Sequence, residues 1–241
     1  MQAMIFAAGL GTRFKPWTDQ HPKALAVVNG KSLLQRNIEY LKEYGITNLI
    51  INVHHFAEQV KEAVRENKGW GSHISISDES GELLETGGGL LKAKPFFKEG
   101  QKFMTCNADI LTDLDLHRLI AFHEKNKPLI SFGITNRVTS RYLLFDKDMR
   151  LCGWRNTKTG EEKISIPQKG LVPMAYSTIA LFEYKVFDLM EAAGFKGKFS
   201  LVDVYLELAK DQLIMGFDHS GDRFVDVGKT ESIGLAASIF T

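Results

Sequence analysis

Two hydrophobic patterns alternate along the first half of the chain. One consists of short apolar runs, typical of buried strands, and the other repeats an apolar residue every three or four positions, typical of amphipathic helices. The helical pattern begins after Ser32, which with Gln35 predicts a capping box, and again after Asp115. This alternation predicts an α/β fold with helices packed on a mostly parallel sheet. The apolar runs are residues 4–8, 48–53, 103–106 and 129–134.

The pattern changes after about residue 135. Residues 141–182 contain alternating apolar and polar positions separated by polar turns, which favours an antiparallel and more open section. A helical pattern returns at 201–208, and apolar runs follow at 213–217 and 224–228. We expect this second part to complete the sheet of the first part rather than to form a domain of its own.

The composition narrows the classes of partner. The chain has 241 residues, 44% hydrophobic and 24% charged, with a net charge of +1, which suits one α/β domain and argues against nucleic acid or an anionic membrane. No apolar run approaches the ~20 residues of a membrane helix, and no basic region of a signal peptide precedes the first strand. Cys106 and Cys152 belong to no Cys-x-x-Cys pair. We expect a cytoplasmic protein, a monomer or small homo-oligomer, that acts on small molecules.

A glycine loop with cations beside it follows the first strand. Residues 9–11 read Gly-Leu-Gly, so bare backbone N–H groups can approach a phosphate there. Phe14 stands where a dinucleotide-binding motif needs its third glycine, which excludes that motif. Arg13, Lys15 and Lys23 place three cations near the turn. Because polyanions need charge as well as backbone donors, this combination suits a nucleoside triphosphate together with a second phosphate group.

A second glycine-rich segment, residues 85–89, reads Glu-Thr-Gly-Gly-Gly. Three consecutive glycines at the start of a predicted helix leave room for a flat base against the backbone, although the segment taken alone favours a flexible helix start. The carboxylates in and before this segment are expected to form a solvated face, since carboxylates are seldom buried without a partner. They are Asp78, Glu79, Glu82 and Glu85.

Two aspartates lie at the ends of predicted strands. Asp109 follows the apolar run 103–106, and Asp226 lies within 224–228. Ligands of an open α/β sheet bind beyond the carboxyl ends of its strands, so we expect the two carboxylates at one site. Mg²⁺ takes oxygen ligands and accompanies phosphates, and we therefore predict that Asp109 and Asp226 share one Mg²⁺ ion.

Together these segments resemble the sugar-1-phosphate nucleotidylyltransferase family. The resemblance extends from residue 2 to about residue 235. Among the branches of the family, the short form with Glu-Thr-Gly-Gly-Gly is most similar to the N-acetylmuramate-1-phosphate uridylyltransferases of cell-wall sugar recycling. The motifs that carry the resemblance are Gly9–Arg13 with Pro16, Thr18 and Pro22–Leu25, then Leu84–Gly89, Asn107–Asp109 with Thr112–Asp113, and Val225–Gly228.

The resemblance implies a Rossmann-like sheet of the nucleotide-diphospho-sugar transferase type within a single domain, residues 1–241. Residues 1–135 are then the nucleotide-binding half, and residues 136–241 the sugar-phosphate-binding half with the smaller antiparallel section. The implied reaction is an in-line attack of a sugar 1-phosphate, N-acetylmuramate 1-phosphate in this branch, on the α-phosphorus of a nucleoside triphosphate, UTP. Pyrophosphate leaves, and the implied cofactor is Mg²⁺.

The resemblance also implies roles for single residues. Arg13, Lys23 and Asp109 are the implied catalytic residues, and Asp109 and Asp226 the implied Mg²⁺ ligands. Lys23 bridges the attacking phosphate and the α-phosphate, and Glu85 contacts the acceptor. The residues implied to hold the nucleotide are Ala8, Gly9, Gly11, Thr12, Arg13, Thr86, Gly87, Gly88 and Asn107.

One motif of the larger relatives is missing. They carry a Glu-Lys-Pro whose lysine contacts the sugar phosphate, whereas residues 153–156 here read Gly-Trp-Arg-Asn. Arg155 and Lys163 are the candidates to replace that lysine at the substrate. Residues 158–168 form either an ordered wall of the sugar pocket or a lid.

Three alternatives stay open. The substrates can be another hexose 1-phosphate with dTTP or GTP, or phosphocholine with CTP, for which Trp17, Trp154 and Tyr176 offer an aromatic box. A non-catalytic sensor of nucleotide sugars is the third. The predicted metal pair disfavours it, because binding alone needs no such pair, and the fold cannot decide since one scaffold hosts many functions.

Overall fold

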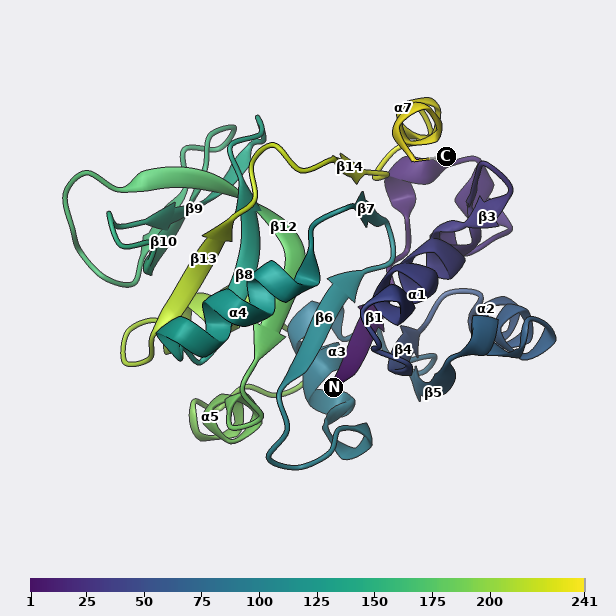
Figure 1. The fold of residues 1–241 in the computed structure, drawn as a ribbon, viewed down its shortest axis with the longest axis horizontal. Helices are drawn as coiled ribbons and strands as arrows, with labels where there is room; N and C mark the ends of the chain where they lie inside the picture. The colour runs from purple at the N-terminus through teal and green to yellow at the C-terminus, as the bar shows by residue number, and fades with distance from the viewer. Residues whose placement is uncertain (241) are drawn as a thin grey trace.

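The computed structural model describes residues 1–240. Its centre is a ten-stranded sheet with the order β11-β10-β9-β12-β6-β1-β4-β5, while β8 pairs with both β12 and β13 (Figure 1). The strands are β1 (Gln2–Phe6), β4 (Asn48–Val53), β5 (His73–Asp78), β6 (Phe103–Asn107), β8 (Ile130–Thr135), β9 (Arg141–Phe145), β10 (Leu151–Asn156), β11 (Glu162–Ile164), β12 (Val172–Phe182) and β13 (Ile214–Asp218).

The predicted parallel sheet is confirmed. Strands β6, β1, β4 and β5 run parallel to one another, and β13 runs parallel to β8. Along β1, Met4 and Phe6 belong to one core and Ala3 and Ile5 to the other, and all four side chains are buried. Burial on both faces explains why this strand has a continuous apolar run instead of an alternating pattern.

Helices cover both faces of the sheet. Apolar side chains of α1, α2 and α4 pack in the core that contains Ile5, and those of α3, α5 and α6 pack in the core that contains Met4. Figure 1 shows α1 and α4 in front of the sheet. No helix within residues 1–240 is both long and apolar enough to span a bilayer. The helices are α1 (Leu33–Glu43), α2 (Ala57–Glu66), α3 (Glu85–Lys92), α4 (Leu116–Asn126), α5 (Val186–Ala192), α6 (Leu201–Leu208) and α7 (Ser232–Ile239).

Strand β12 joins the parallel part of the sheet to an antiparallel part. Its first residues, Val172–Met174, pair with β9, and its last, Ala180–Phe182, pair with β6 and β8. The register shifts between these two stretches, where Thr178 adopts a φ of +61°. Strands β9, β10 and β11 continue as antiparallel neighbours, as the alternating pattern of residues 141–182 predicts. The second half of the chain therefore shares one sheet with the first.

Two short strand pairs and α7 build a third, smaller core. Strand β7 (Ile110–Thr112) pairs with β14 (Phe224–Asp226), and β2 (Val27–Val28) pairs with β3 (Lys31–Ser32). Leu111, Val225 and Ala236 are buried together there. Figure 1 shows α7 above the part of the chain that contains β3, so the last described helix returns to the beginning of the sequence.

Several strand boundaries and one helix cap differ from the predictions. Strand β1 ends at Phe6 rather than at residue 8, so Ala7 and Ala8 already belong to the glycine loop. Ser32 does cap α1, accepting a hydrogen bond from the Gln35 N–H at 3.1 Å, but the Gln35 side chain donates to Glu39 and leaves the capping box half formed. The last strand ends at residue 226 instead of 228.

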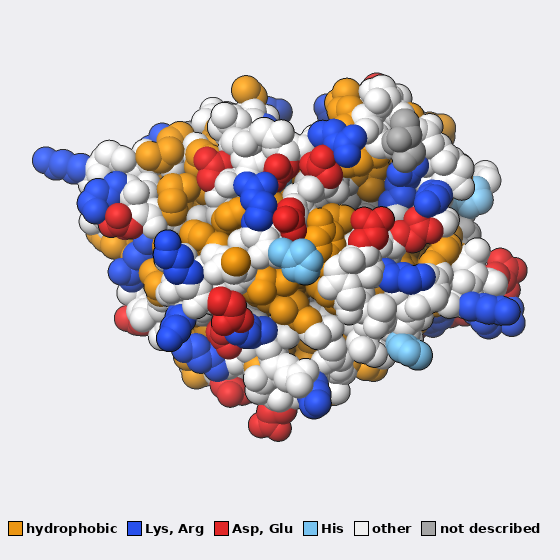
Figure 2. Space-filling view, in the orientation of Figure 1, with side chains coloured by type: hydrophobic (Ala, Val, Ile, Leu, Met, Phe, Trp, Pro, Cys, Tyr) orange, Lys and Arg blue, Asp and Glu red, His pale blue; other side chains and the backbone are white. Residues whose placement is uncertain are grey.

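The charged side chains are well mixed on the surface. On the face shown in Figure 2, Lys and Arg alternate with Asp and Glu, and no broad area carries a single sign. This distribution agrees with the net charge of +1. An anionic ligand would therefore be held by individual cations in a pocket rather than by a broad charged face.

Candidate active site

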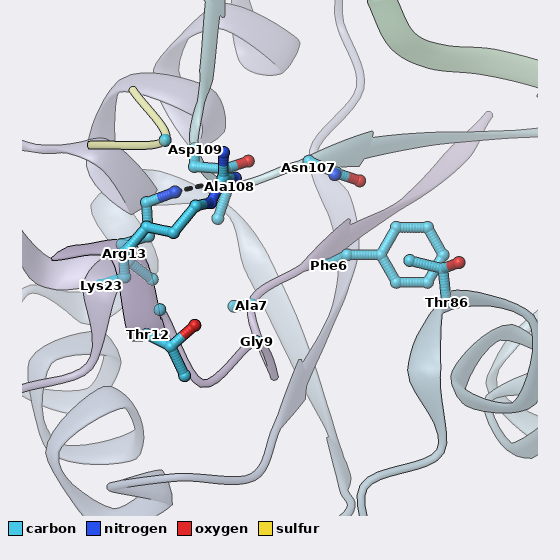
Figure 3. Close-up of a pocket in the computed structure, with 13 residues that line it drawn as sticks. Phe6, Ala7, Gly9, Thr12, Arg13, Lys23, Thr86, Asn107, Ala108 and Asp109 are labelled. Carbon is cyan, nitrogen blue, oxygen red and sulfur yellow. Dashed lines mark hydrogen bonds and ion pairs between the residues drawn. The ribbon is translucent and has the colours of Figure 1, made fainter. Parts of the chain in front are cut away.

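A pocket, called here the central pocket, opens at the carboxyl ends of β1 and β6 in the middle of the sheet (Figure 3). This is the edge at which open α/β sheets bind their ligands. Figure 3 shows Arg13, Lys23 and Asp109 on one side and Thr86 on the other. The residues that line the pocket are Phe6, Ala7, Gly9, Gly11, Thr12, Arg13, Lys23, Ala24, Thr86, Asn107, Ala108, Asp109 and Gly228.

The two glycines of the first loop differ in their backbone conformation and in their surroundings. Gly11 has a φ of +60°, and a Cβ there would lie 2.8 Å from a methyl carbon of Thr18 and 3.1 Å from the Cβ of Lys23. Thr18 also donates its hydroxyl to the Gly11 carbonyl at 2.9 Å, which fixes the turn. Gly9 has no positive φ, and a Cβ there would meet nothing within 4 Å. The bare backbone at Gly9 thus leaves space open on the pocket side.

A buried polar chain connects the glycine loop to α3. The Ala7 N–H donates to Asn52 Oδ1 at 2.8 Å, and Asn52 Nδ2 donates to Glu79 Oε1 at 2.7 Å. The Leu84 N–H, just before α3, donates to the other oxygen of Glu79 at 3.3 Å. Glu79 is fully buried, so its predicted place on a solvated face is wrong. Burial raises the pKa of Glu79, and its bonds to Asn52 and Leu84 oppose that rise.

Lys23 and Asp109 form an ion pair at the mouth of the pocket (Figure 3). Their side chains are only 11% and 26% exposed, so solvent screens this pair less than a surface pair. Asn37 of α1 holds the turn that carries Asp109, since its side-chain nitrogen donates to the carbonyls of Ala108 at 3.0 Å and Ile110 at 3.1 Å. The fold therefore fixes the direction of both charges.

The β7–β14 pair places Asp226 beside Asp109. The Val227 N–H donates to the Asp109 carbonyl at 2.9 Å, so the backbones that carry the two aspartates are neighbours. A Cβ at Gly228 would lie 2.7 Å from Asp226 Oδ1 and 3.1 Å from a terminal nitrogen of Arg13. Gly228 thus allows Arg13 to approach Asp226.

The donor set near the two aspartates fits a cation that is also bound by a ligand. No group of three His, Cys, Asp or Glu side chains capable of holding a metal occurs within residues 1–240. Asp226 forms no ion pair within these residues, and Asp109 uses one oxygen for Lys23. Two carboxylates and phosphate oxygens are the partners that Mg²⁺ commonly takes, because it retains waters and binds few protein ligands.

Residues 197–199 of the chain fill the space beside the second glycine segment. The N–H groups of Gly87 and Gly88 both donate to the Phe199 carbonyl, at 3.0 and 3.1 Å. A Cβ at Gly87 would lie 2.4 Å from the Phe199 ring, and one at Gly88 would lie 2.1 Å from the Gly197 carbonyl oxygen. Neither glycine lines the central pocket. The sequence predicted room for a flat base here, whereas residues 197–199 fill the space beside Gly87 and Gly88.

The neighbours of these glycines occupy different places. Thr86 lines the central pocket, and its hydroxyl accepts a hydrogen bond from the Leu201 N–H at 3.0 Å, at the start of α6. Glu85 lies outside the pocket, 3.7 Å from Lys198. Of the other residues predicted to hold a nucleotide, five line the pocket: Gly9, Gly11, Thr12, Arg13 and Asn107. Ala8 of the glycine loop is buried and does not line it.

A second hollow, called here the side pocket, adjoins the central pocket. Arg13 lines both, and Asp226 lines the side pocket. The wall opposite comes from the antiparallel part of the sheet, including Trp154 and Tyr176. Trp17 is absent from it and packs instead on His21, with ring centroids 4.5 Å apart, so the predicted three-membered aromatic box does not form.

The two predicted substitutes for the missing lysine lie elsewhere. Arg155 forms an ion pair with Glu162 at 2.5 Å, and Lys163 contacts Asp203 at 3.3 Å. Neither side chain lines the central or the side pocket. Alternation along β10 explains the place of Arg155, because its neighbours Trp154 and Asn156 point to the opposite face and line the side pocket. Lys163 pairs with Trp154 and lies 5.8 Å from the centroid of its ring, on the same face but outside the pocket.

Sequence reasoning missed Asn37 and Asn52, which position the site without lining it. Both are buried, and each interrupts an apolar pattern, Asn52 within the run 48–53 and Asn37 on the buried stripe of α1. A buried amide must find partners, so a polar residue at an apolar position was the available signal.

Comparison with known proteins agrees with this geometry. The family model described as nucleotidyl transferase matches residues 2–151. An N-acetylmuramate alpha-1-phosphate uridylyltransferase from Neisseria meningitidis is 41% identical over 115 residues, 48% of this chain and 49% of the relative. One from Caulobacter vibrioides is 43% identical over 104 residues, 42% of this chain and 43% of the relative. The matched segment thus spans about half the length of these curated relatives.

A solved structure resembles the chain over its full length. The crystal structure of HddC from Yersinia pseudotuberculosis, complexed with GMP-PN, has a TM-score of 0.77 and 22% sequence identity, and covers 100% of this chain and 99% of its own. This likeness shows that the two proteins share a fold. With the match of the family model over residues 2–151, the chain belongs to the nucleotidyl transferase family.

Proposed function

We propose that the protein is a Mg²⁺-dependent nucleotidylyltransferase that joins N-acetylmuramate 1-phosphate to UTP and releases pyrophosphate. The observation that carries the proposal is the convergence of Arg13, Lys23 and Asp109 around a pocket that Gly9 leaves open. The names of the two bacterial relatives support the choice of sugar and base. The nucleotide is assigned to the central pocket and the sugar phosphate to the side pocket.

The two pockets suit a direct displacement. A sugar phosphate is largely ionised at neutral pH, so its oxygen can attack the α-phosphorus without a strong general base. The main obstacle is the repulsion between two polyanions. Arg13, which lines both pockets, and Lys23, held by Asp109, are placed to neutralise that repulsion and to align the reacting groups.

Asp109 and Asp226 are the residues proposed to hold Mg²⁺. When bound, the ion supplies positive charge to the phosphate oxygens and to the leaving pyrophosphate. The protein's own part is to keep both carboxylates on adjacent backbones through the Val227–Asp109 hydrogen bond. Lys23, which lies beside Asp109, would contact the phosphate groups of the ligand.

Phosphocholine is a weaker candidate for the acceptor. A quaternary ammonium needs an aromatic box, and only two of the three expected rings, Trp154 and Tyr176, border the side pocket. Arg137 and Arg141 border it as well, and their charge repels another cation. The charges therefore favour an anionic acceptor.

The test is pyrophosphate release, with Mg²⁺, across a grid of substrates. UTP, dTTP, CTP and GTP are crossed with the 1-phosphates of N-acetylmuramate, N-acetylglucosamine, glucose and mannose, and with phosphocholine. We expect strong release only with UTP and N-acetylmuramate 1-phosphate. Release with another pair would support the same type of reaction with different substrates. A blank grid together with Mg²⁺-dependent nucleotide binding would favour the sensor.

A further inference from the structure

The side pocket is richer in cations than one phosphate group requires. Arg13, Arg137, Arg141 and Lys158 line it, and the one carboxylate among its lining residues is Asp226. Arg13 stands at the junction with the central pocket, where the α-phosphate is proposed to lie. No motif of the sequence singled out Arg137 or Arg141, whereas Lys158 belongs to the stretch 158–168.

Among these cations, Arg137 is held most firmly. It follows β8, and one of its terminal nitrogens donates to the Tyr176 carbonyl at 3.0 Å. Its guanidinium lies over the Phe224 ring, 4.9 Å from the centroid. These two contacts fix the plane of the guanidinium, so the side chain loses little freedom when it binds an anion.

The charge of Arg137 is not neutralised by the protein. No carboxylate within residues 1–240 forms an ion pair with it, and its Nε is buried without a hydrogen-bond partner. Burial lowers the pKa of Arg137 while Asp226 opposes that change, yet a guanidinium stays protonated in proteins. A charged group with unfilled hydrogen-bonding capacity beside a pocket is expected where a ligand completes its set of partners.

Arg137, which follows β8, differs from Arg155 of β10 because no carboxylate of the described residues forms an ion pair with Arg137. Arg155 already has Glu162 as its partner, and Lys163 has Asp203. An anion at either residue would have to displace a carboxylate, whereas Arg137 has only the charge of Asp226 nearby, beyond ion-pair distance. The favourable electrostatic change on binding a phosphate is therefore larger at Arg137.

We propose that Arg137 holds the phosphate monoester of the acceptor and so does the work of the lysine that the Glu-Lys-Pro motif supplies in larger relatives. This inference rests on the proposed function, because it takes the side pocket to be the acceptor's. A sugar phosphate between Arg13 and Arg137 has its charge contacted from two sides, with the attacking oxygen toward the central pocket.

Steady-state kinetics with Arg137→Ala and Arg137→Lys test the inference. We expect Arg137→Ala to raise the KM for the sugar 1-phosphate roughly 10- to 100-fold, the scale of a hydrogen bond to a charged group, with the KM for UTP nearly unchanged. Arg137→Lys keeps the charge but not the planar fork, so an intermediate KM is expected. Arg118→Ala is the matched control, because Arg118 also stacks on a phenylalanine, Phe217, but lines neither pocket.

A merely structural role for Arg137 would change the melting temperature and the KM values of both substrates together. The same assay on Arg155→Ala and Lys163→Ala tests the two rival residues. A larger rise in the acceptor KM with either variant than with Arg137→Ala overturns the inference. If Arg137→Ala does not fold, a wild-type acceptor KM in Arg137→Lys and Arg137→Gln overturns it equally.

Direct binding separates this inference from the proposed function. Titration calorimetry with N-acetylmuramate 1-phosphate, with glucose 1-phosphate and with inorganic phosphate needs no turnover. Weaker phosphate binding by Arg137→Ala than by the wild type supports the inference even if the substrate grid is blank. Equal binding by the two proteins, or no binding by the wild type, rejects it even if the enzyme turns over.

Discussion

The two glycine-rich segments near the central pocket use their missing side chains in opposite ways. At Gly9, which lines the pocket together with Arg13 and Lys23, a Cβ would meet nothing within 4 Å. At Gly87 and Gly88 the same kind of space is filled by Phe199 and Gly197 of the chain itself. We therefore expect the first segment to serve a ligand, whereas the second brings α3 against the residues before α6.

This difference shows what a glycine reveals in a sequence. Glycine indicates that something approaches the backbone closely or that φ is positive, but it does not say what approaches. Cations beside Gly9, at Arg13 and Lys23, identify a phosphate as the expected neighbour. In the second segment, Gly87 and Gly88 face an aromatic ring and backbone, and Gly89 faces the side chains of Glu79 and Asn52.

The largest expected effect is a loss of turnover when the ion pair beside the first glycine segment is removed. Lys23→Ala and Asp109→Ala should each lower turnover ~100-fold or more, the scale of losing one preorganised electrostatic stabiliser. Rates of pyrophosphate release measure this, with circular dichroism as the check on folding. Lys31→Ala serves as the control, since Lys31 pairs with Glu39 outside the central pocket. Near-normal turnover in both variants would remove Lys23 and Asp109 from the catalytic site.

The next effect falls on stability and tests the second segment. Gly88→Ala forces a methyl group against the Gly197 carbonyl oxygen, only 2.1 Å from the ideal Cβ position. Because that neighbour is backbone and cannot rotate away, we expect a loss of about 1–3 kcal/mol or more in the free energy of unfolding. Urea denaturation measures the loss. An unchanged midpoint would mean that the contact between α3 and residues 197–199 is loose.

Gly9→Ala should have the opposite effects to Gly88→Ala, on substrate binding rather than on stability. Gly9→Ala places a methyl group where nothing lies within 4 Å, so the free energy of unfolding should change by no more than about 0.5 kcal/mol. If a triphosphate fills that space, the KM for UTP should rise about tenfold, the scale of overpacking a tight contact. A Gly9→Ala variant with the wild-type KM would show that the nucleotide lies elsewhere.

The smallest expected effect is a pH dependence of stability that arises away from both segments. Burial lowers the pKa of His123 and of His219 below the ordinary value of 6.5, so the unfolded chain binds protons there more readily than the folded one. Stability from these groups is complete above pH 6.5 and decreases as the pH falls below it. Urea midpoints at pH 7.5 and 5.5 measure the decrease.

A matched variant assigns that decrease to a residue. His219 Nε2 lies 2.7 Å from the Ser177 hydroxyl, beside the shift in β12, and His219→Gln keeps a polar group there. The difference between the two pH values should shrink in this variant, even if its overall stability is lower. An unchanged difference would mean that other groups control the acid sensitivity.

Much of the fold could be predicted because its signals are local. The run 48–53 and the helical pattern 201–208 match β4 and α6 at both ends. Their periodicity reflects which side chains must be buried, and this is written into neighbouring positions. Boundaries beside loops were less certain, and β1 ends two residues earlier than predicted because the loop backbone already turns at Ala7 to bond Asn52.

The sequence by itself determined the α/β architecture, the cationic glycine loop and the family resemblance, since each depends on residues close together along the chain. Only the tertiary structure decided that Lys23 pairs with Asp109 across 86 positions, that residues 197–199 fill the second glycine segment, and that Arg137 rather than Arg155 faces the side pocket. Such contacts depend on how distant strands are ordered in the sheet. Neither the periodicity nor the composition of a single segment contains that order.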